Sequence, residues 1–149
     1  MIAPFDYAAI TRILPHRHPF LLVDRVTEFE PDRRIVGIKN VSSNEPYIVR
    51  CDDTLVLPPT ILMEAMAQVG AILVLAKPEN RDRLIYFLGV TRARYRRPAR
   101  AGDVVVMEAR VDRMRGLMGR LKGEARVDGA IIASGAMSFA LGSKDDLPR

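Results

Sequence analysis

One segment of the chain, from about Pro59 to Ala76, is apolar on nearly every side and narrowly limits the possible folds. Proline is accepted in the first helical turn, where its missing N–H has no intrahelical partner to lose, and Pro78 supplies a stop. The sequence therefore predicts a helix here, and other elements must surround it. Its apolar side chains are spread around the helical wheel: Ile61, Leu62, Met63, Met66, Val69, Ile72, Leu73 and Leu75.

The second half of the chain supplies those surrounding elements. From Leu84 to Leu141 the pattern changes to a two-residue alternation, which predicts strands with one face in a core. Asp128-Gly129 suits a type I′ turn, because both central positions of that turn need a positive φ. We expect this turn to join two antiparallel strands, the second running from Ile131 to Phe139.

The hydrophobic pattern of the first half of the chain is less regular. Residues Leu21 to Val26 and Arg34 to Val41 are expected to form two strands, and Asn44 to Leu57 a loop. One apolar helix followed by long antiparallel strands is an α+β pattern in which a curved antiparallel sheet wraps a long central helix, the hot-dog fold. We expect a single domain over residues 1–149.

Composition limits the class of protein further. With 149 residues, 48% of them hydrophobic and 28% charged, the chain fits one compact domain. The single cysteine, Cys51, cannot form an internal disulfide, and the N-terminus carries no signal-peptide pattern, so a cytoplasmic location is expected. The longest apolar run is shorter than the roughly 20 residues of a bilayer-spanning helix, which indicates no membrane.

Four stretches carry a resemblance to a known family. Residues 14–26 read Leu-Pro-His-Arg-His-Pro-Phe-Leu-Leu-Val-Asp-Arg-Val, which closely resembles the opening motif of the (3R)-hydroxyacyl-acyl carrier protein dehydratases. Residues 39–46, 63–68 and 93–103 resemble three later motifs of that family, in the same order. The resemblance implies a hot-dog homodimer, often three such dimers together, with active sites between subunits. It also implies acyl carrier protein or CoA thioesters as partners, and no cofactor or metal.

The same resemblance assigns the reaction and its acid. The family dehydrates a (3R)-3-hydroxyacyl thioester to the trans-2-enoyl form, with a histidine as base and a helix glutamate serving the departing hydroxyl. Glu64 matches that glutamate, and a carboxyl on an apolar helix costs free energy unless it has a partner or a task. A hydrogen-bonded structural carboxylate is the alternative. We expect the substrate to contact Pro58, Pro59, Thr60 and Gln68.

The histidine of this catalytic pair is missing. Depending on the direction of counting, its position falls on Arg50 or on Cys51, and the expected Gly-His-Phe-Pro-Gly motif is absent. Arginine stays protonated and a cysteine thiol is an ordinarily poor base. His16 and His18 belong to the opening motif, where a structural role is expected. An imidazole, or a plausibly ionised thiol, within reach of the pocket that Glu64 faces would restore ordinary dehydration as the leading expectation.

A second departure concerns the carbonyl oxygen of the thioester. The family's Pro-Gly becomes Pro58-Pro59, so the glycine N–H that would face this oxygen is lost. Removing one such donor typically lowers the rate on the order of 100-fold to 1000-fold. Impaired dehydration is therefore expected, and two alternatives stay open: a non-catalytic partner or binding module, and a thioesterase that uses Glu64.

Arginines crowd the segment from Arg92 to Arg100, and the formal net charge of the chain is +5. Such a patch favours an anionic partner, and we expect Arg94, Arg96 and Arg97 to dock an acidic carrier protein. A solvated basic strand edge, which discourages wrong pairing, explains the pattern equally well. A nucleic-acid partner is not expected, because no reader motif accompanies the patch.

Overall fold

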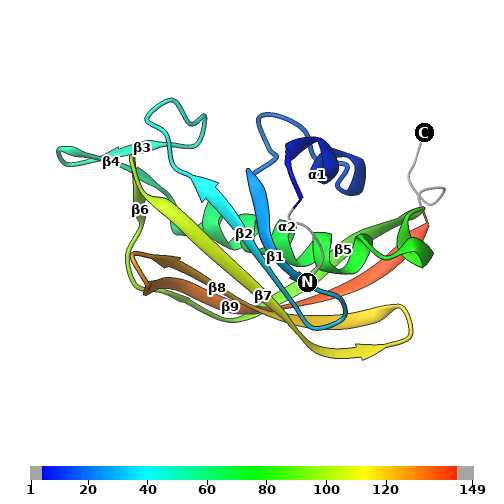
Figure 1. The fold of residues 1–149 in the computed structure, drawn as a ribbon. Coiled ribbons are helices and arrows are strands. Elements are labelled where there is room, and N and C mark those ends of the chain that lie inside the picture. Colours follow the sequence, from blue (N-terminus) through cyan, green and yellow to red (C-terminus); the bar gives the residue numbers. More distant parts are fainter. Residues whose placement is uncertain (1–4, 144–149) are drawn as a thin grey trace.

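The computed structural model describes residues 5–143, and within them it has the expected α+β architecture (Figure 1). Two α-helices, α1 (Tyr7–Ile13) and α2 (Pro59–Leu75), are accompanied by the short 3₁₀ helix η1 (Pro78–Asn80). The strands are β1 (Arg25–Glu30), β2 (Arg34–Asn40), β3 (Val49–Cys51), β4 (Thr54–Leu57), β5 (Arg83–Tyr95), β6 (Ala99–Arg100), β7 (Val104–Arg115), β8 (Met118–Val127) and β9 (Ala130–Ser143).

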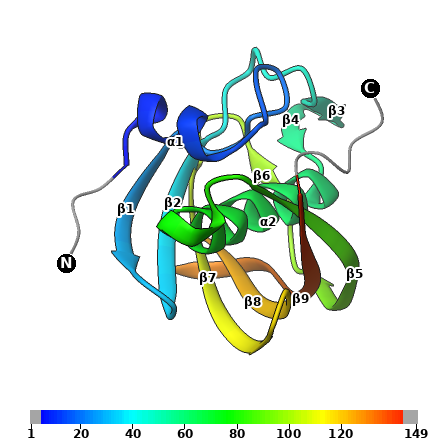
Figure 2. The ribbon, with the colours of Figure 1, turned by 90° about the vertical axis from the view of Figure 1, so that its right-hand side faces the viewer.

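Six strands form one antiparallel sheet in the order β1-β2-β7-β8-β9-β5. Figure 2 looks along α2 and shows this sheet curling around it, with β1 and β2 on one side, β5 and β9 on the other, and α1 over the open side. A smaller sheet, β3-β4-β6, lies near the start of α2. The hot-dog prediction for the fold is thus confirmed.

Helix α2 is the centre of the core. Every residue from Leu62 to Leu75 except Glu64 is buried, so the prediction of a surrounded helix is confirmed. The helix approaches the sheet closely at Gly70, where an added Cβ would lie 2.5 Å from Cδ1 of Leu121. On the β8 side of this contact, Leu121 and Ala125 are fully buried. Small residues on α2 therefore let a curved sheet close around it.

The turn between β8 and β9 has the predicted geometry. Asp128 has a φ of 50° and Gly129 a φ of 79°, so both central residues are left-handed as a type I′ turn requires. Val127 pairs with Ala130 directly across this turn. The burial of alternate residues along β7 also agrees with the predicted alternation.

Three details of the first half differ from expectation. The strand predicted over Leu21 to Val26 begins at Arg25, because the backbone N–H of Leu22 donates to Oε1 of Gln68 (2.8 Å) instead of to a neighbouring strand. The predicted loop over Asn44 to Leu57 ends in the β3-β4 hairpin. Helix α1 was not predicted, although Asp6 caps it by accepting from the Ala9 N–H (2.8 Å).

Within residues 5–143, none of the helices has both the length and the apolar character needed to cross a bilayer.

Candidate active site

Glu64 lies in the second turn of α2, at the wall of a pocket of about 290 Å³ between this helix and β5. Its side chain is 29% exposed in the isolated chain. It is the only carboxylate among the lining residues, which are Thr60, Met63, Glu64, Ala67, Phe87, Val90, Tyr95 and Met137. A single acidic group therefore faces a mostly apolar pocket, an arrangement suited to proton transfer on a fatty substrate.

Gln68 holds Glu64 in place from one helical turn further along. The Gln68 side chain is fully buried, and its Nε2 atom donates to Oε1 of Glu64 (2.9 Å) and to the backbone carbonyl of Phe20 (2.8 Å). The Leu22 N–H in turn donates to Oε1 of Gln68. The opening motif is thus attached to the helix that carries the carboxylate. Gln68 was predicted to contact substrate, and here it supports Glu64 without lining the pocket.

His16 reaches the same carboxylate. Its Nε2 atom lies 3.7 Å from Oε1 of Glu64, within ion-pair range and longer than a hydrogen bond. Burial lowers the pKa of His16, and the nearby Glu64 charge only partly offsets this effect, so the imidazole is neutral at pH 7. Its Nδ1 atom is buried and has no hydrogen-bond partner among the described residues. The expected structural role for His16 did not foresee this contact.

The β3-β4 hairpin carries Arg50 and Cys51, the two positions at which the family's histidine was expected from the sequence. Arg50 and Cys51 lie on β3, where both side chains are exposed. They pair with Leu55 and Thr54 of β4, and the hairpin projects beyond the start of α2 (Figure 1). Neither residue lines the pocket that contains Glu64 within this chain.

At the start of α2, Pro58 and Pro59 begin the helix and Thr60 lines the Glu64 pocket. Pro58 is the N-cap and its carbonyl accepts from the Ile61 N–H (3.0 Å). Pro59 is the first helical residue and has no N–H to offer, as the sequence indicated. Of the residues expected to contact substrate here, only Thr60 lines the Glu64 pocket.

The three arginines expected to dock a carrier protein have different surroundings. Arg94 lines a hollow in the outer face of the sheet. Arg96 is exposed, whereas Arg97 pairs with Asp103 (3.3 Å). Arg97 is therefore partly neutralised by a neighbour in its own chain.

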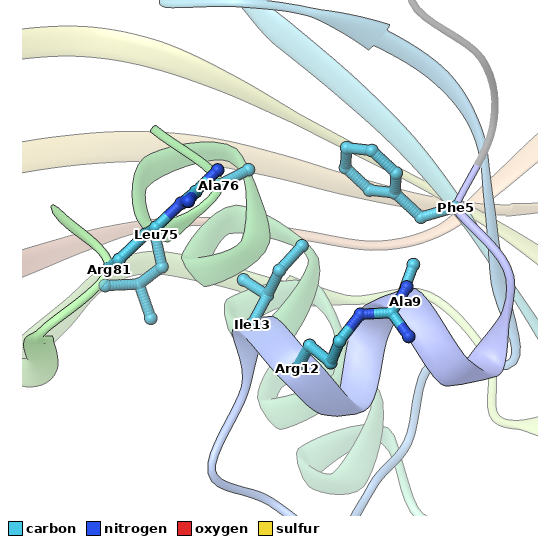
Figure 3. A pocket seen from close by; sticks show the side chains of 7 residues that line it. All are labelled: Phe5, Ala9, Arg12, Ile13, Leu75, Ala76 and Arg81. Atoms are coloured by element: carbon cyan, nitrogen blue, oxygen red, sulfur yellow. The ribbon is translucent and has the colours of Figure 1, made fainter. Parts of the chain in front are cut away.

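A second, larger pocket of about 440 Å³ lies at the other end of α2 (Figure 3). It is bounded by α1 and the end of α2, with Arg12 and Arg81 among its lining residues, and includes Phe5, Ala9, Ile13, Leu75 and Ala76. Glu64 and Leu75 are eleven helical residues apart, or roughly 16 Å at 1.5 Å per residue. This pocket is therefore separate from the Glu64 site.

Comparison with known proteins places this geometry in a family. Residues 14–136 match the family described as FabA-like domain. The 3-hydroxyacyl-(acyl-carrier-protein) dehydratase FabZ of Anoxybacillus flavithermus is 45% identical over 140 residues, which cover 93% of this chain and 99% of the relative.

Two solved structures agree in fold at lower identity. The dehydratase heterocomplex ApeI:P from Xenorhabdus doucetiae superposes with a TM-score of 0.80 at 22% identity, covering 92% of this chain and 93% of the other. A hot-dog-like protein from Thermanaerovibrio acidaminovorans has a TM-score of 0.61 at 20% identity, covering 78% and 86%. The match over most of the chain, together with the FabZ relatives, shows that this protein belongs to the FabA-like family of hot-dog proteins and, within it, to the FabZ dehydratases.

Proposed function

We propose that this protein binds (3R)-3-hydroxyacyl thioesters of acyl carrier protein and dehydrates them to trans-2-enoyl thioesters in fatty-acid metabolism, at an impaired rate. In this reaction the α-carbon loses a proton, the bond between C3 and the hydroxyl breaks, and an acid protonates the leaving hydroxyl to give water. The α-proton passes to water, because among the described residues no side-chain base besides Glu64 lines the pocket. The observation that carries the proposal is Glu64: it is the sole carboxylate at a largely apolar pocket, and Gln68 orients it. Glu64 is the proposed acid.

His16 supports Glu64 in this proposal and does not replace the missing base. Its Nε2 faces the carboxylate, its Nδ1 is buried, and it does not line the pocket. A substrate in the pocket therefore meets the Glu64 oxygens and no lone pair of His16. The 3.7 Å contact nevertheless favours a second candidate, in which His16 shifts and acts as the base, giving full dehydratase activity.

The assembly proposed is a homodimer that joins active sites across subunits, with a trimer of dimers as its larger form, in the cytoplasm. The free edge strand β5 carries exposed apolar side chains, including Leu88 (55% exposed) and Val90 (47% exposed), which suit such a contact. We expect Arg94, Arg96 and Arg97 to attract the acidic carrier protein.

The test is a dehydration assay on short- to long-chain 3-hydroxyacyl carrier-protein thioesters, with the Anoxybacillus flavithermus FabZ as reference. A missing general base predicts turnover lower by on the order of 100-fold or more. Glu64→Gln should remove what remains, and Arg50→His or Cys51→His should recover part of the loss. Wild-type turnover in Glu64→Gln would disprove the assignment of the acid. Loss in His16→Gln of an otherwise FabZ-like rate would instead support the second candidate.

A non-catalytic role as partner of a complete dehydratase is favoured by the exposed β3-β4 hairpin, which offers Arg50 and Cys51 where an imidazole is expected. Co-purification with a FabZ whose helix glutamate is changed to glutamine tests this role. Co-purification without activity in the mixture would support it, whereas activity that appears only in the mixture would show that this chain supplies the acid and is not a non-catalytic partner. Release of free thiol without enoyl product would indicate the thioesterase alternative.

A further inference from the structure

The outer face of the main sheet, opposite α2, holds a hollow of about 270 Å³ between β5, β8 and β9. Its cationic side chains are Arg92, Arg94, Arg120 and Lys122, and we call it the basic hollow. On β8 the side chain of Leu121, between two of these residues, is fully buried on the α2 face. The basic hollow is therefore separated from the Glu64 pocket by the sheet itself.

The charge in the basic hollow is only partly neutralised by the protein. Glu124, the one acidic lining residue, is held by Arg126 at 2.6 Å. Asp112 approaches both Lys122 (2.5 Å) and Arg120 (3.6 Å), so one carboxylate is shared by two cations. Arg92 and Arg94 make no ion pair within residues 5–143. Among the described residues, the four cations of the basic hollow thus outnumber the carboxylates near them, Glu124 and Asp112, and Glu124 is already paired with Arg126.

A β-bulge shapes one wall of the basic hollow. Thr91 pairs with Ala136 and Arg94 with Ser134, so two residues of β5 lie opposite Gly135 alone. Within this bulge Arg92 has a φ of 56°, a left-handed conformation that is unfavourable for an arginine. Bulges and strained residues of this kind concentrate beside functional sites, where they direct side chains. Here the bulge accompanies two arginines that line the same space.

Arg120 adds a third and independent observation. Its Nε atom is buried and has no hydrogen-bond acceptor among the described residues. The carboxylate of Asp112 approaches this atom only to 3.6 Å, beyond hydrogen-bond distance. Buried donors in native proteins almost always have a partner, and a bound ion can supply the acceptor that the protein lacks.

We infer that the basic hollow binds a phosphate group, as a phosphate monoester or a diphosphate. Planar guanidinium groups bind phosphate oxygens in a two-pronged manner, and three guanidinium side chains, those of Arg92, Arg94 and Arg120, line this space. The site does not depend on the reaction proposed for Glu64, which lies on the other face of the sheet.

The first experiment is calorimetric titration of the full chain with pyrophosphate at low salt, without any carrier protein. The double variant Arg92→Gln/Arg94→Gln should bind at least tenfold more weakly than wild type. Arg110→Gln is the matched control, because Arg110 is exposed on β7, outside the basic hollow. Equal weakening by the control and the double variant, or no binding by wild type, would overturn the inference.

Arg120→Lys separates a shaped site from general attraction, since it keeps the charge and removes the planar Nε–H. We expect a several-fold loss of pyrophosphate affinity, and an unchanged affinity would count against the site. Inorganic phosphate, CoA and dephospho-CoA distinguish the sources of the group. Preference for CoA over dephospho-CoA, lost in Arg92→Gln/Arg94→Gln, would assign the site to the terminal phosphate of a CoA ligand. Equal binding of the two would assign it to the diphosphate they share.

Discussion

The imidazole of His16 and the carboxylate of Glu64 come within 3.7 Å of each other although 48 positions separate them in the sequence. Helix α2 brings Glu64 there, and the opening motif brings His16. The Glu64 carboxylate affects the pKa of His16, because its charge favours the protonated imidazole while burial opposes it. A substitution of Glu64 should therefore change the titration of His16.

Glu64→Gln should lower the pKa of His16 below its wild-type value. Burial already lowers this pKa, and the substitution removes the Glu64 charge that raises it. Since the chain has two histidines, NMR titration of their ring protons resolves both, and exposed His18 serves as the internal control. A His16 titration that does not move would show that the two groups are farther apart in solution.

The same pKa gives the direction of a pH effect on stability. The unfolded chain, with His16 near its ordinary value of about 6.5, binds more protons than the folded chain below that pH. Stability from His16 is therefore complete above about pH 6.5 and declines as the pH falls towards the lower folded pKa. His16→Gln should flatten this part of the profile in urea unfolding at several pH values.

Gln68→Met should lower the free energy of unfolding by about 1–3 kcal/mol, because the buried Leu22 N–H would lose the side-chain oxygen to which it donates. The substitution keeps the length of the side chain and removes three hydrogen bonds. Urea denaturation measures the change, and any dehydration should fall with it as Glu64 loses its support. Gln68→Glu retains a side-chain oxygen that can accept from the Leu22 N–H, but it places a second carboxylate beside Glu64. If the repulsion between the two carboxylates costs less than the hydrogen bond contributes, Gln68→Glu is less destabilised at neutral pH than Gln68→Met.

The fold could be predicted because its helix and strands follow from residue types at close spacing in the sequence. The all-round apolar run predicted α2, and the alternation with Asp128-Gly129 predicted the β8-β9 hairpin, since burial and turn geometry depend on residue type at close spacing. The site was only partly predictable. Glu64 was predicted as a site residue from its apolar helix and its motif, and the structure places it at the wall of a pocket. Its contact with His16 joins distant segments, and no periodicity reports such a pairing.

The start of β1 shows the same limit. Leu21 to Asp24 has the composition of a strand, yet the Leu22 N–H donates to the side chain of Gln68. A side-chain acceptor 46 residues away overrode the local β-propensity. The basic hollow was foreseen only as a run of arginines, because Arg120 and Lys122 join it from another strand.

Gly70→Ala should destabilise the protein by about 1–3 kcal/mol, even though alanine is the better helix former. The new methyl group would lie 2.5 Å from Cδ1 of Leu121, so this fully buried side chain would have to shift within a closely packed core. Thermal or urea unfolding checks this value. Gly89→Ala is the control, since nothing lies within 4 Å of its added Cβ. Recovery in Gly70→Ala/Leu121→Val would attribute the loss to that contact.

Lys39 and Glu45 form a buried ion pair that joins β2 to the segment leading into the β3-β4 hairpin. Their side chains are 5% and 13% exposed, and the Nζ–Oε1 distance is 2.6 Å. Removing one partner leaves the other charge buried, so Lys39→Met and Glu45→Leu should each cost about 3–5 kcal/mol. The double replacement should be less destabilised than the sum of the two.

The exposed pair between Lys122 and Asp112 is the control for this prediction. Lys122 is 61% exposed, and pairs of that kind contribute less than about 1 kcal/mol. Lys122→Met should therefore change the urea midpoint little, whereas Lys39→Met shifts it strongly. If both variants unfolded at the same midpoint, the Lys39–Glu45 contact would not anchor the hairpin, which would then be held mainly by the pairing of β4 with β6.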